Sequence, residues 1–79
     1  MRSIQPIVVG PYSYDFVTTQ CCEQIHQHMI DARRQSGVEA QLRKERAYGV
    51  YLVWRALVSD TADPFRYFRD DRRLEALLA

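Results

Sequence analysis

Four side chains able to bind metal or act as nucleophiles fall within a single short segment: Cys21, Cys22, His26 and His28. Cys22 and His26 are four residues apart, so a helix would place both on one face as two zinc ligands. A structural zinc site takes four ligands, and no Cys or His follows His28 in the sequence. We therefore expect no metal site and no cofactor. Cys21 and His28 are predicted to lie in a buried helical stripe, where free cysteine is common.

The sequence patterns for other kinds of catalysis are also incomplete. Cys22 and His26 could form a nucleophile and base, but no third group is identified that would orient the base. The three glycines are isolated at positions 10, 37 and 49, so there is no phosphate-binding loop. Asp70 and Asp71 lie among arginines, which is typical of ion pairs on a solvated face. The sequence predicts that the protein is not an enzyme.

Composition narrows the class of protein. The chain has 79 residues, 47% hydrophobic and 27% charged, with a net charge of +1, which is typical of one globular domain. This nearly neutral net charge excludes a strongly acidic protein that mimics nucleic acid and a strongly basic protein that covers it. Two adjacent cysteines are no secreted disulfide framework, and the apolar N-terminal residues are too interrupted for a signal peptide. We expect a cytoplasmic protein with reduced thiols and no membrane contact.

The most apolar stretch is Ala47–Val58, in which Arg55 is the only charged residue. It is shorter than the about 20 residues that span a bilayer. At helical spacing it has one large face, made of Ala47, Val50, Tyr51, Trp54, Leu57 and Val58. A small-residue stripe (Gly49, Val53, Ala56) lies beside that face, and Tyr48, Leu52, Arg55 and Ser59 form the stripe most exposed to water. The preceding residues are good helix formers, which favours a helix. The alternative is a strand over 50–58 paired with residues 4–9, giving an α+β fold.

The predicted fold is therefore all-α: an extended arm (1–12) followed by helices over 13–35, 38–59 and 64–78, in one domain. Ser13 and Asp63 are candidate N-caps, and Pro64 suits the first helical position. The short Ser36-Gly37 link makes the first two helices an antiparallel hairpin. The Gly49–Val53–Ala56 stripe is predicted to admit a second close neighbour, such as the third helix.

The third predicted helix has two apolar faces. Phe65, Phe68, Arg72 and Ala76 fall on one side, and Tyr67, Leu74, Leu77 and Leu78 fall nearly opposite. A helix buried on a single face would not show this pattern. We expect one face to meet the hairpin and the other to meet a second copy or a partner.

Two groups of residues are candidates for binding a partner. The first is a basic cluster near the hairpin tip: Arg33, Arg34, Arg43, Lys44 and Arg46. The second is the exposed remainder of the apolar stretch: Tyr48, Leu52 and Arg55. Because Tyr, Trp and Arg are enriched at binding hot spots, the sequence predicts a small non-enzymatic protein-binding module, a regulator or inhibitor that occupies a partner's surface. Its size class also suits a mobile-element-encoded inhibitor of a host defence complex.

The assembly and a rival function follow from the same features. Chains of about 80 residues rarely gain more than about 3–5 kcal/mol from one core, so we expect a homodimer or a hetero-complex. The rival is a nucleic-acid-binding transcriptional regulator that uses the basic hairpin tip. A recognition helix presents polar and basic side chains to the bases. The second helix is too apolar in its C-terminal half for that role, and the third is as acidic as it is basic.

Overall fold

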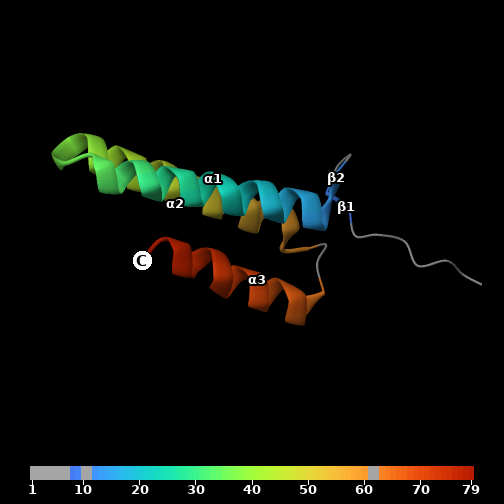
Figure 1. Ribbon diagram of the computed structural model, residues 1–79. Helices are drawn as coiled ribbons and strands as arrows, with labels where there is room; N and C mark the ends of the chain where they lie inside the picture. Colours follow the sequence, from blue (N-terminus) through green and yellow to red (C-terminus); the bar gives the residue numbers. More distant parts are fainter. Residues whose placement is uncertain (1–7, 10–11, 61–62) are drawn as a thin grey trace, which may run out of the picture.

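The computed structural model describes residues 8–9, 12–60 and 63–79, and it confirms the all-α prediction (Figure 1). Its helices are α1 (Tyr14–Arg34), α2 (Gly37–Val58) and α3 (Pro64–Leu77). The predicted bounds differ from these by a single residue at most ends. In the predicted arm, β1 (Val8–Val9) pairs antiparallel with β2 (Tyr12–Ser13). The rest of the arm, 1–7 and 10–11, lies outside the described residues.

The α+β alternative is wrong, because residues 50–58 are helical. Helical spacing buries Tyr51, Trp54 and Val58 together on one side of α2, whereas a strand would turn Tyr51 away from the other two. Of the segment proposed to pair with 50–58, residues 4–7 lie outside the described part. Val8–Val9 pairs with its own neighbour Tyr12–Ser13.

Local signals in the sequence set the helix ends. The Ser13 hydroxyl accepts the Phe16 backbone N–H at 3.1 Å at the start of α1. Asp63 accepts the N–H groups of Phe65 at 2.8 Å and Arg66 at 3.4 Å at the start of α3. Gly37 has a φ of 64°, a left-handed conformation in which glycine has no steric penalty. That residue lets the chain reverse between α1 and α2 within a short link.

The three helices are arranged as an antiparallel hairpin with α3 packed along one side of it (Figure 1). α3 runs in the same direction as α1 and ends before the hairpin tip, so the tip extends beyond it. The buried apolar side chains come from all three helices: Tyr14, Ile25, Met29, Ala32, Ala47, Tyr51, Trp54, Val58 and Leu74. The described part of the chain thus has one core, and α3 covers it on one side but does not reach the hairpin tip.

One packing prediction is wrong. The stripe of Gly49, Val53 and Ala56 does not receive α3, since a Cβ at Gly49 would meet no atom within 4 Å and Val53 is exposed. Leu57, which helical spacing groups with Tyr51, Trp54 and Val58 on the large apolar face, is also exposed. α3 packs instead against the side of α2 that carries Tyr51 and Trp54. The reason is chemical: that side offers a phenol and an indole ring, which give α3 hydrogen-bonding and stacking partners.

Candidate functional site

The inner face of α3 is the apolar set Tyr67, Leu74, Leu77 and Leu78, and it packs on the hairpin. Leu74 is fully buried. The Tyr67 ring stacks on the Trp54 ring, with centroids 5.4 Å apart and planes within 5°. The Trp54 Nε1–H donates to the Thr18 hydroxyl at 2.9 Å, so a fully buried indole is also hydrogen-bonded. These contacts confirm that one of the two predicted faces of α3 meets the hairpin.

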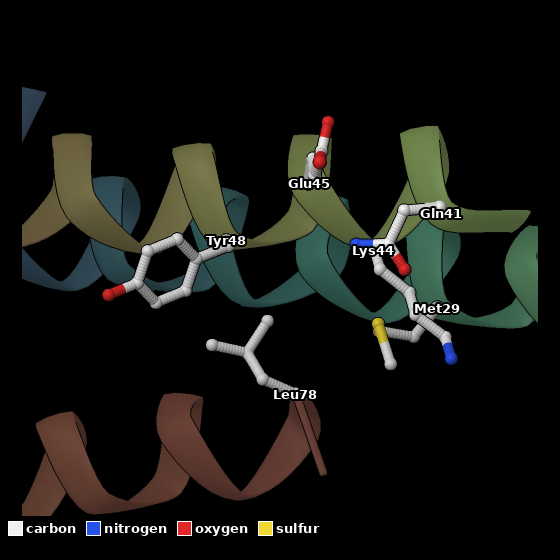
Figure 2. Close-up of a pocket in the computed structure, with 6 residues that line it drawn as sticks. All are labelled: Met29, Gln41, Lys44, Glu45, Tyr48 and Leu78. Atoms are coloured by element: carbon white, nitrogen blue, oxygen red, sulfur yellow. The ribbon is translucent and has the colours of Figure 1, made fainter. Parts of the chain in front are cut away.

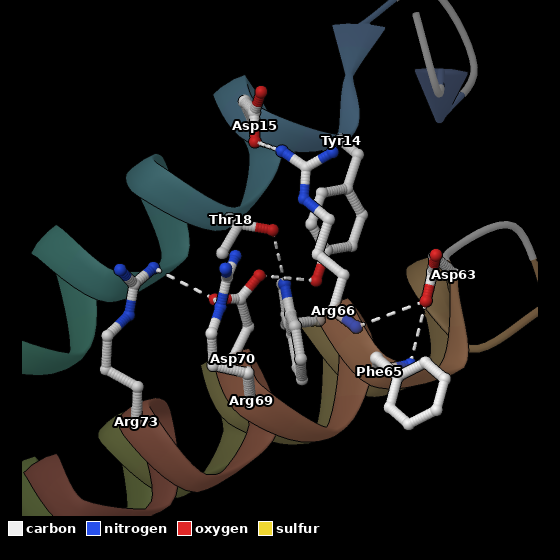
Figure 3. Close-up of polar contacts among 10 residues, drawn as sticks. Tyr14, Asp15, Thr18, Asp63, Phe65, Arg66, Arg69, Asp70 and Arg73 are labelled. Carbon is white, nitrogen blue, oxygen red and sulfur yellow. Dashed lines mark hydrogen bonds and ion pairs between the residues drawn. The ribbon is translucent and has the colours of Figure 1, made fainter.

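The acidic side chains of α3 also turn toward the hairpin. Asp70 is only 3% exposed and accepts a hydrogen bond of 2.7 Å from the Tyr14 hydroxyl (Figure 3). Asp71 accepts one of 2.7 Å from the Tyr51 hydroxyl, which lies 3.3 Å from Glu75 as well. Hydrogen bonds to a carboxylate are stronger than neutral ones. The two phenols therefore tie α3 to both helices of the hairpin.

The buried Asp70 carboxylate has cations nearby on its own helix. Arg69 Nε lies 3.4 Å and an Arg73 Nη 3.7 Å from its Oδ1, while both arginine side chains remain mostly exposed (Figure 3). A buried charge is tolerated when it is paired and hydrogen-bonded. Burial, followed by the hydrogen bond to Asp70 and the charge of Asp70, raises the pKa of Tyr14 to about 12. Burial and the bond to Asp71 likewise raise the pKa of Tyr51.

Two arginines complete the attachment of α3. Arg66 forms an ion pair with Asp15 of α1, and its guanidinium carbon lies 4.8 Å from the centre of the Tyr14 ring. From α2, Arg55 donates its Nε–H to the Tyr67 hydroxyl at 3.3 Å and lies 3.7 Å from Asp71. α3 is thus held by polar contacts along much of its length in addition to its apolar residues.

The outer face of α3 carries the opposite chemistry. Phe65 is 89% exposed and Phe68 62% exposed, and Arg69 and Arg72 lie beside them. We call these four residues the aromatic–arginine face. They line an open hollow of about 560 Å³. Phe65 has the largest exposed fraction of any large hydrophobic residue in the described chain. The aspartates of α3 accept hydrogen bonds from the hairpin or cap the helix, so the outer face of α3 is basic and aromatic.

The predicted basic cluster lies on the part of the hairpin that α3 does not cover. Arg33 and Arg34 occupy the last turn of α1 and are exposed, and Lys44 and Arg46 are exposed on α2. Arg43 is less exposed and lies 3.8 Å from Asp31 of α1. The structure thus places all five basic residues on the same uncovered end, with one of them in an ion pair across the hairpin.

The other predicted partner-binding residues fall into two environments. Tyr48 and Leu52 are exposed. Tyr48 and Lys44 line a hollow of about 310 Å³ at the C-terminal end of α3, with Met29, Gln41, Glu45 and Leu78 (Figure 2). Arg55 differs, because its contacts with Tyr67 and Asp71 place it in the interface between α2 and α3. Those contacts, the hydrogen bond to Tyr67 first, raise its pKa.

The cysteine and histidine segment lies in the middle of α1. Cys21 and Cys22 are half-buried free thiols, and both pack against the core. Burial raises the pKa of the Cys21 thiol, which lowers its thiolate fraction at neutral pH. His26 is exposed and His28 half-buried. Across residues 8–9, 12–60 and 63–79, no three His, Cys, Asp or Glu side chains are grouped to hold a metal ion. None of the helices in these residues has the length and apolar character needed to span a membrane.

The aromatic–arginine face was not among the binding residues predicted from the sequence. The two-sided pattern of α3 was recognised there, but its charged residues were assigned to a solvated face with local ion pairs. The spacing of the aromatic residues in the sequence contains a signal that could have predicted this face. Two tyrosines on buried helix faces need hydrogen-bond partners, and neighbouring aspartates on a third helix can supply them. That assignment would have turned Phe65 and Phe68 outward.

No family model, no curated protein and no solved structure matches the chain.

Proposed function

We propose that the chain is a non-enzymatic protein-binding module, which regulates or inhibits a partner by covering its surface with the aromatic–arginine face. The observation that carries this proposal is the near-complete exposure of Phe65 next to the exposed Phe68, Arg69 and Arg72. Aromatic residues and arginine are enriched in the cores of protein interfaces. Burying a phenyl side chain contributes roughly 1.5–3 kcal/mol, so two of them can anchor an interface.

The attachment of α3 to the hairpin supports the proposal, because it reduces the conformational entropy that is lost when a partner binds. The helix is held by the Tyr14–Asp70 and Tyr51–Asp71 hydrogen bonds on its inner side. Its backbone is therefore ordered before a partner arrives. Ordering interface groups upon binding costs about 0.5–1.5 kcal/mol for each mobile side chain, and a preformed helix avoids the backbone part of such costs. A rigid helix face is a common way to present an anchor to a groove.

The charges around the two phenylalanines indicate the chemistry of the partner. Arg69 lies 3.4 Å from the buried Asp70 but its side chain remains mostly exposed, and Asp63 accepts backbone N–H groups, so the outer surface stays basic. Arg69 and Arg72 are exposed on the same side as the rings. A complementary partner surface would have an apolar groove for the rings and carboxylates at its rim, since matching charges steer association and fix its register.

Capture of partners from the source cell tests the proposal. The full chain is immobilised, a nuclease-treated lysate is passed over it, and bound proteins are identified by mass spectrometry. The Phe65→Ser/Phe68→Ser variant should lose a protein that the unchanged chain retains. Val38→Ser is the matched control, because Val38 is also highly exposed but lies at the hairpin tip. A protein retained equally by all three chains would contradict the proposal.

The nucleic-acid reading has one specific observation in its favour. The five basic residues belong to the last turn of α1 and to the N-terminal half of α2, which meet at the hairpin tip. An electrophoretic shift of duplex DNA at low salt is its test. A shift that is abolished by changing Arg43, Lys44 and Arg46 together to alanine, and unaffected by the phenylalanine variant, would replace the protein-binding proposal.

A further inference from the structure

The side of α2 that faces away from α3 carries an apolar stripe without an intrachain cover. Its residues are Leu42, Gly49, Val53 and Leu57, which share one face at helical spacing, and we call them the open stripe. Leu42 and Leu57 are each 47% exposed and Val53 is 56% exposed. A side-chain carbon at Gly49 would meet nothing within 4 Å. The stripe therefore combines protruding apolar side chains with an open gap at Gly49.

Two charged residues lie on the same side of the chain. Arg46 is on the helix between Leu42 and Gly49, and Asp60 follows Leu57 just beyond the helix end. Both are exposed. Within the described residues, neither side chain forms an ion pair with another group of this chain. An unpaired cation before Gly49 and an unpaired anion after Leu57 are a self-complementary arrangement.

We propose that a second copy of this chain packs on the open stripe, with the two α2 helices antiparallel around a two-fold axis at Val53. In a two-fold interface, each residue faces the one at the same sequence distance on the other side of the axis. Leu57 then fills the gap at Gly49 of the second copy. Arg46 faces Asp60 of the second copy, and the two Val53 side chains meet at the centre.

The charges select this register over its neighbour. An axis at Gly49 would allow close approach of the two backbones, but it would place Arg46 opposite Leu52 and leave Asp60 without a cation. An axis at Val53 forms two Arg46–Asp60 pairs between the copies. It also places Leu57 of each copy against Gly49 of the other. Knobs that fill gaps on a facing helix are the usual packing of such pairs. Charge pairing and shape therefore give the same register.

The proposed dimer does not depend on the proposed function, but it determines where the two aromatic–arginine faces lie. Arg55, which contacts α3, is two residues from Val53, and residues two apart point to nearly opposite sides of a helix. α3 therefore lies on the side of the hairpin away from the open stripe. Both aromatic–arginine faces stay exposed in the dimer, which would present two binding faces at once.

Sedimentation equilibrium of the full chain over a wide concentration range tests the dimer. Gly49→Gln should raise the dimer dissociation constant at least about tenfold, the usual effect of overfilling a packed interface. The monomer itself should stay folded, because the space around Gly49 is open and glutamine is a better helix former. Thr19→Gln is the control, since Thr19 is exposed on α1, and it should leave the dissociation constant unchanged.

A charge exchange tests the register. Arg46→Asp and Asp60→Arg should each weaken the dimer, and the two changes together should restore it. An unchanged chain that is monomeric at every concentration would overturn the proposal. So would a dimer that tolerates Gly49→Gln, or one in which the double charge exchange is as weak as the single changes.

Discussion

The two faces of α3 differ in chemistry although they belong to one helix of 14 residues. The inner face uses leucines, a tyrosine ring and two aspartates to hold the hairpin, and Asp70 and Leu74 are buried there. The outer face leaves two phenylalanines and two arginines in water. Larger apolar side chains are thus exposed while carboxylates are buried, the reverse of the usual distribution.

That difference indicates two separate tasks. Phenylalanines could have filled the positions of Tyr14 and Tyr51 on the hairpin, yet the chain has tyrosines there, whose hydroxyls donate to aspartates of α3. Directed hydrogen bonds fix the position and rotation of α3 more closely than apolar packing alone. The fixed rotation keeps Phe65 and Phe68 turned outward. We infer that the inner face stabilises and orients the helix, and that the outer face is available for a partner.

The largest expected effect on the inner side comes from Trp54→Ala. Trp54 is fully buried, stacks on Tyr67 and donates a hydrogen bond to Thr18. Removing a buried indole costs about 3–5 kcal/mol, which is most of the stability expected of a domain this small. Denaturant unfolding followed by circular dichroism measures the loss. A change below about 1 kcal/mol, small beside this range, would show that α3 and α2 do not pack as described.

A smaller loss is expected from Asp70→Ala. The change leaves the buried Tyr14 hydroxyl without its acceptor, which costs about 1–3 kcal/mol of unfolding free energy. Asp70→Asn keeps an acceptor and should cost less. In the Tyr14→Phe background the Asp70→Ala change should cost less as well, because both partners are then absent. Equal costs in the two backgrounds would contradict the hydrogen bond.

Alkaline pH should weaken the attachment of α3 without any mutation. The pKa of Tyr14 is about 12 in the folded chain and near 10 for a free phenol. Between pH 10 and 12, the unfolded chain therefore loses this proton more readily than the folded one, and unfolding is favoured as pH rises. The stabilising contribution is complete below pH 10 and is lost as the pH passes 12. Unfolding curves across this range, compared with Tyr14→Phe, should show a shallower fall for the variant.

The sequence predicted the helices well because its local signals were strong. Ser13, Asp63 and Pro64 mark helix starts, and Gly37 marks the reversal, so those bounds depend only on neighbouring residues. The docking side of α3 was mispredicted because it depends on distant pairs. Helical periodicity shows that Gly49 and Val53 share a stripe, but it does not show that the Tyr51 hydroxyl finds Asp71 across the interface.

The candidate site was predicted only in part for the same reason. Tyr48 and Leu52 are exposed as expected, and the basic residues gather on one end of the hairpin. Arg55 was predicted to be available to a partner, but it contacts Tyr67 and Asp71 on α3. The numbers of positive and negative residues along α3 are balanced, but they do not show that Asp70 is buried while Arg69 and Arg72 stay exposed. That difference follows from tertiary contacts and is absent from composition.

The unfolding free energy of the Phe65→Ser/Phe68→Ser variant, measured beside that of Asp70→Ala, shows whether the two faces of α3 have separate tasks. Both phenylalanines are exposed, and serine has a helix propensity close to that of phenylalanine. The account predicts a change within about 0.5 kcal/mol for the double variant, together with loss of the captured partner, and a clear loss of stability for Asp70→Ala. A double variant as destabilised as Asp70→Ala would show that the outer face supports the fold, and would contradict the account.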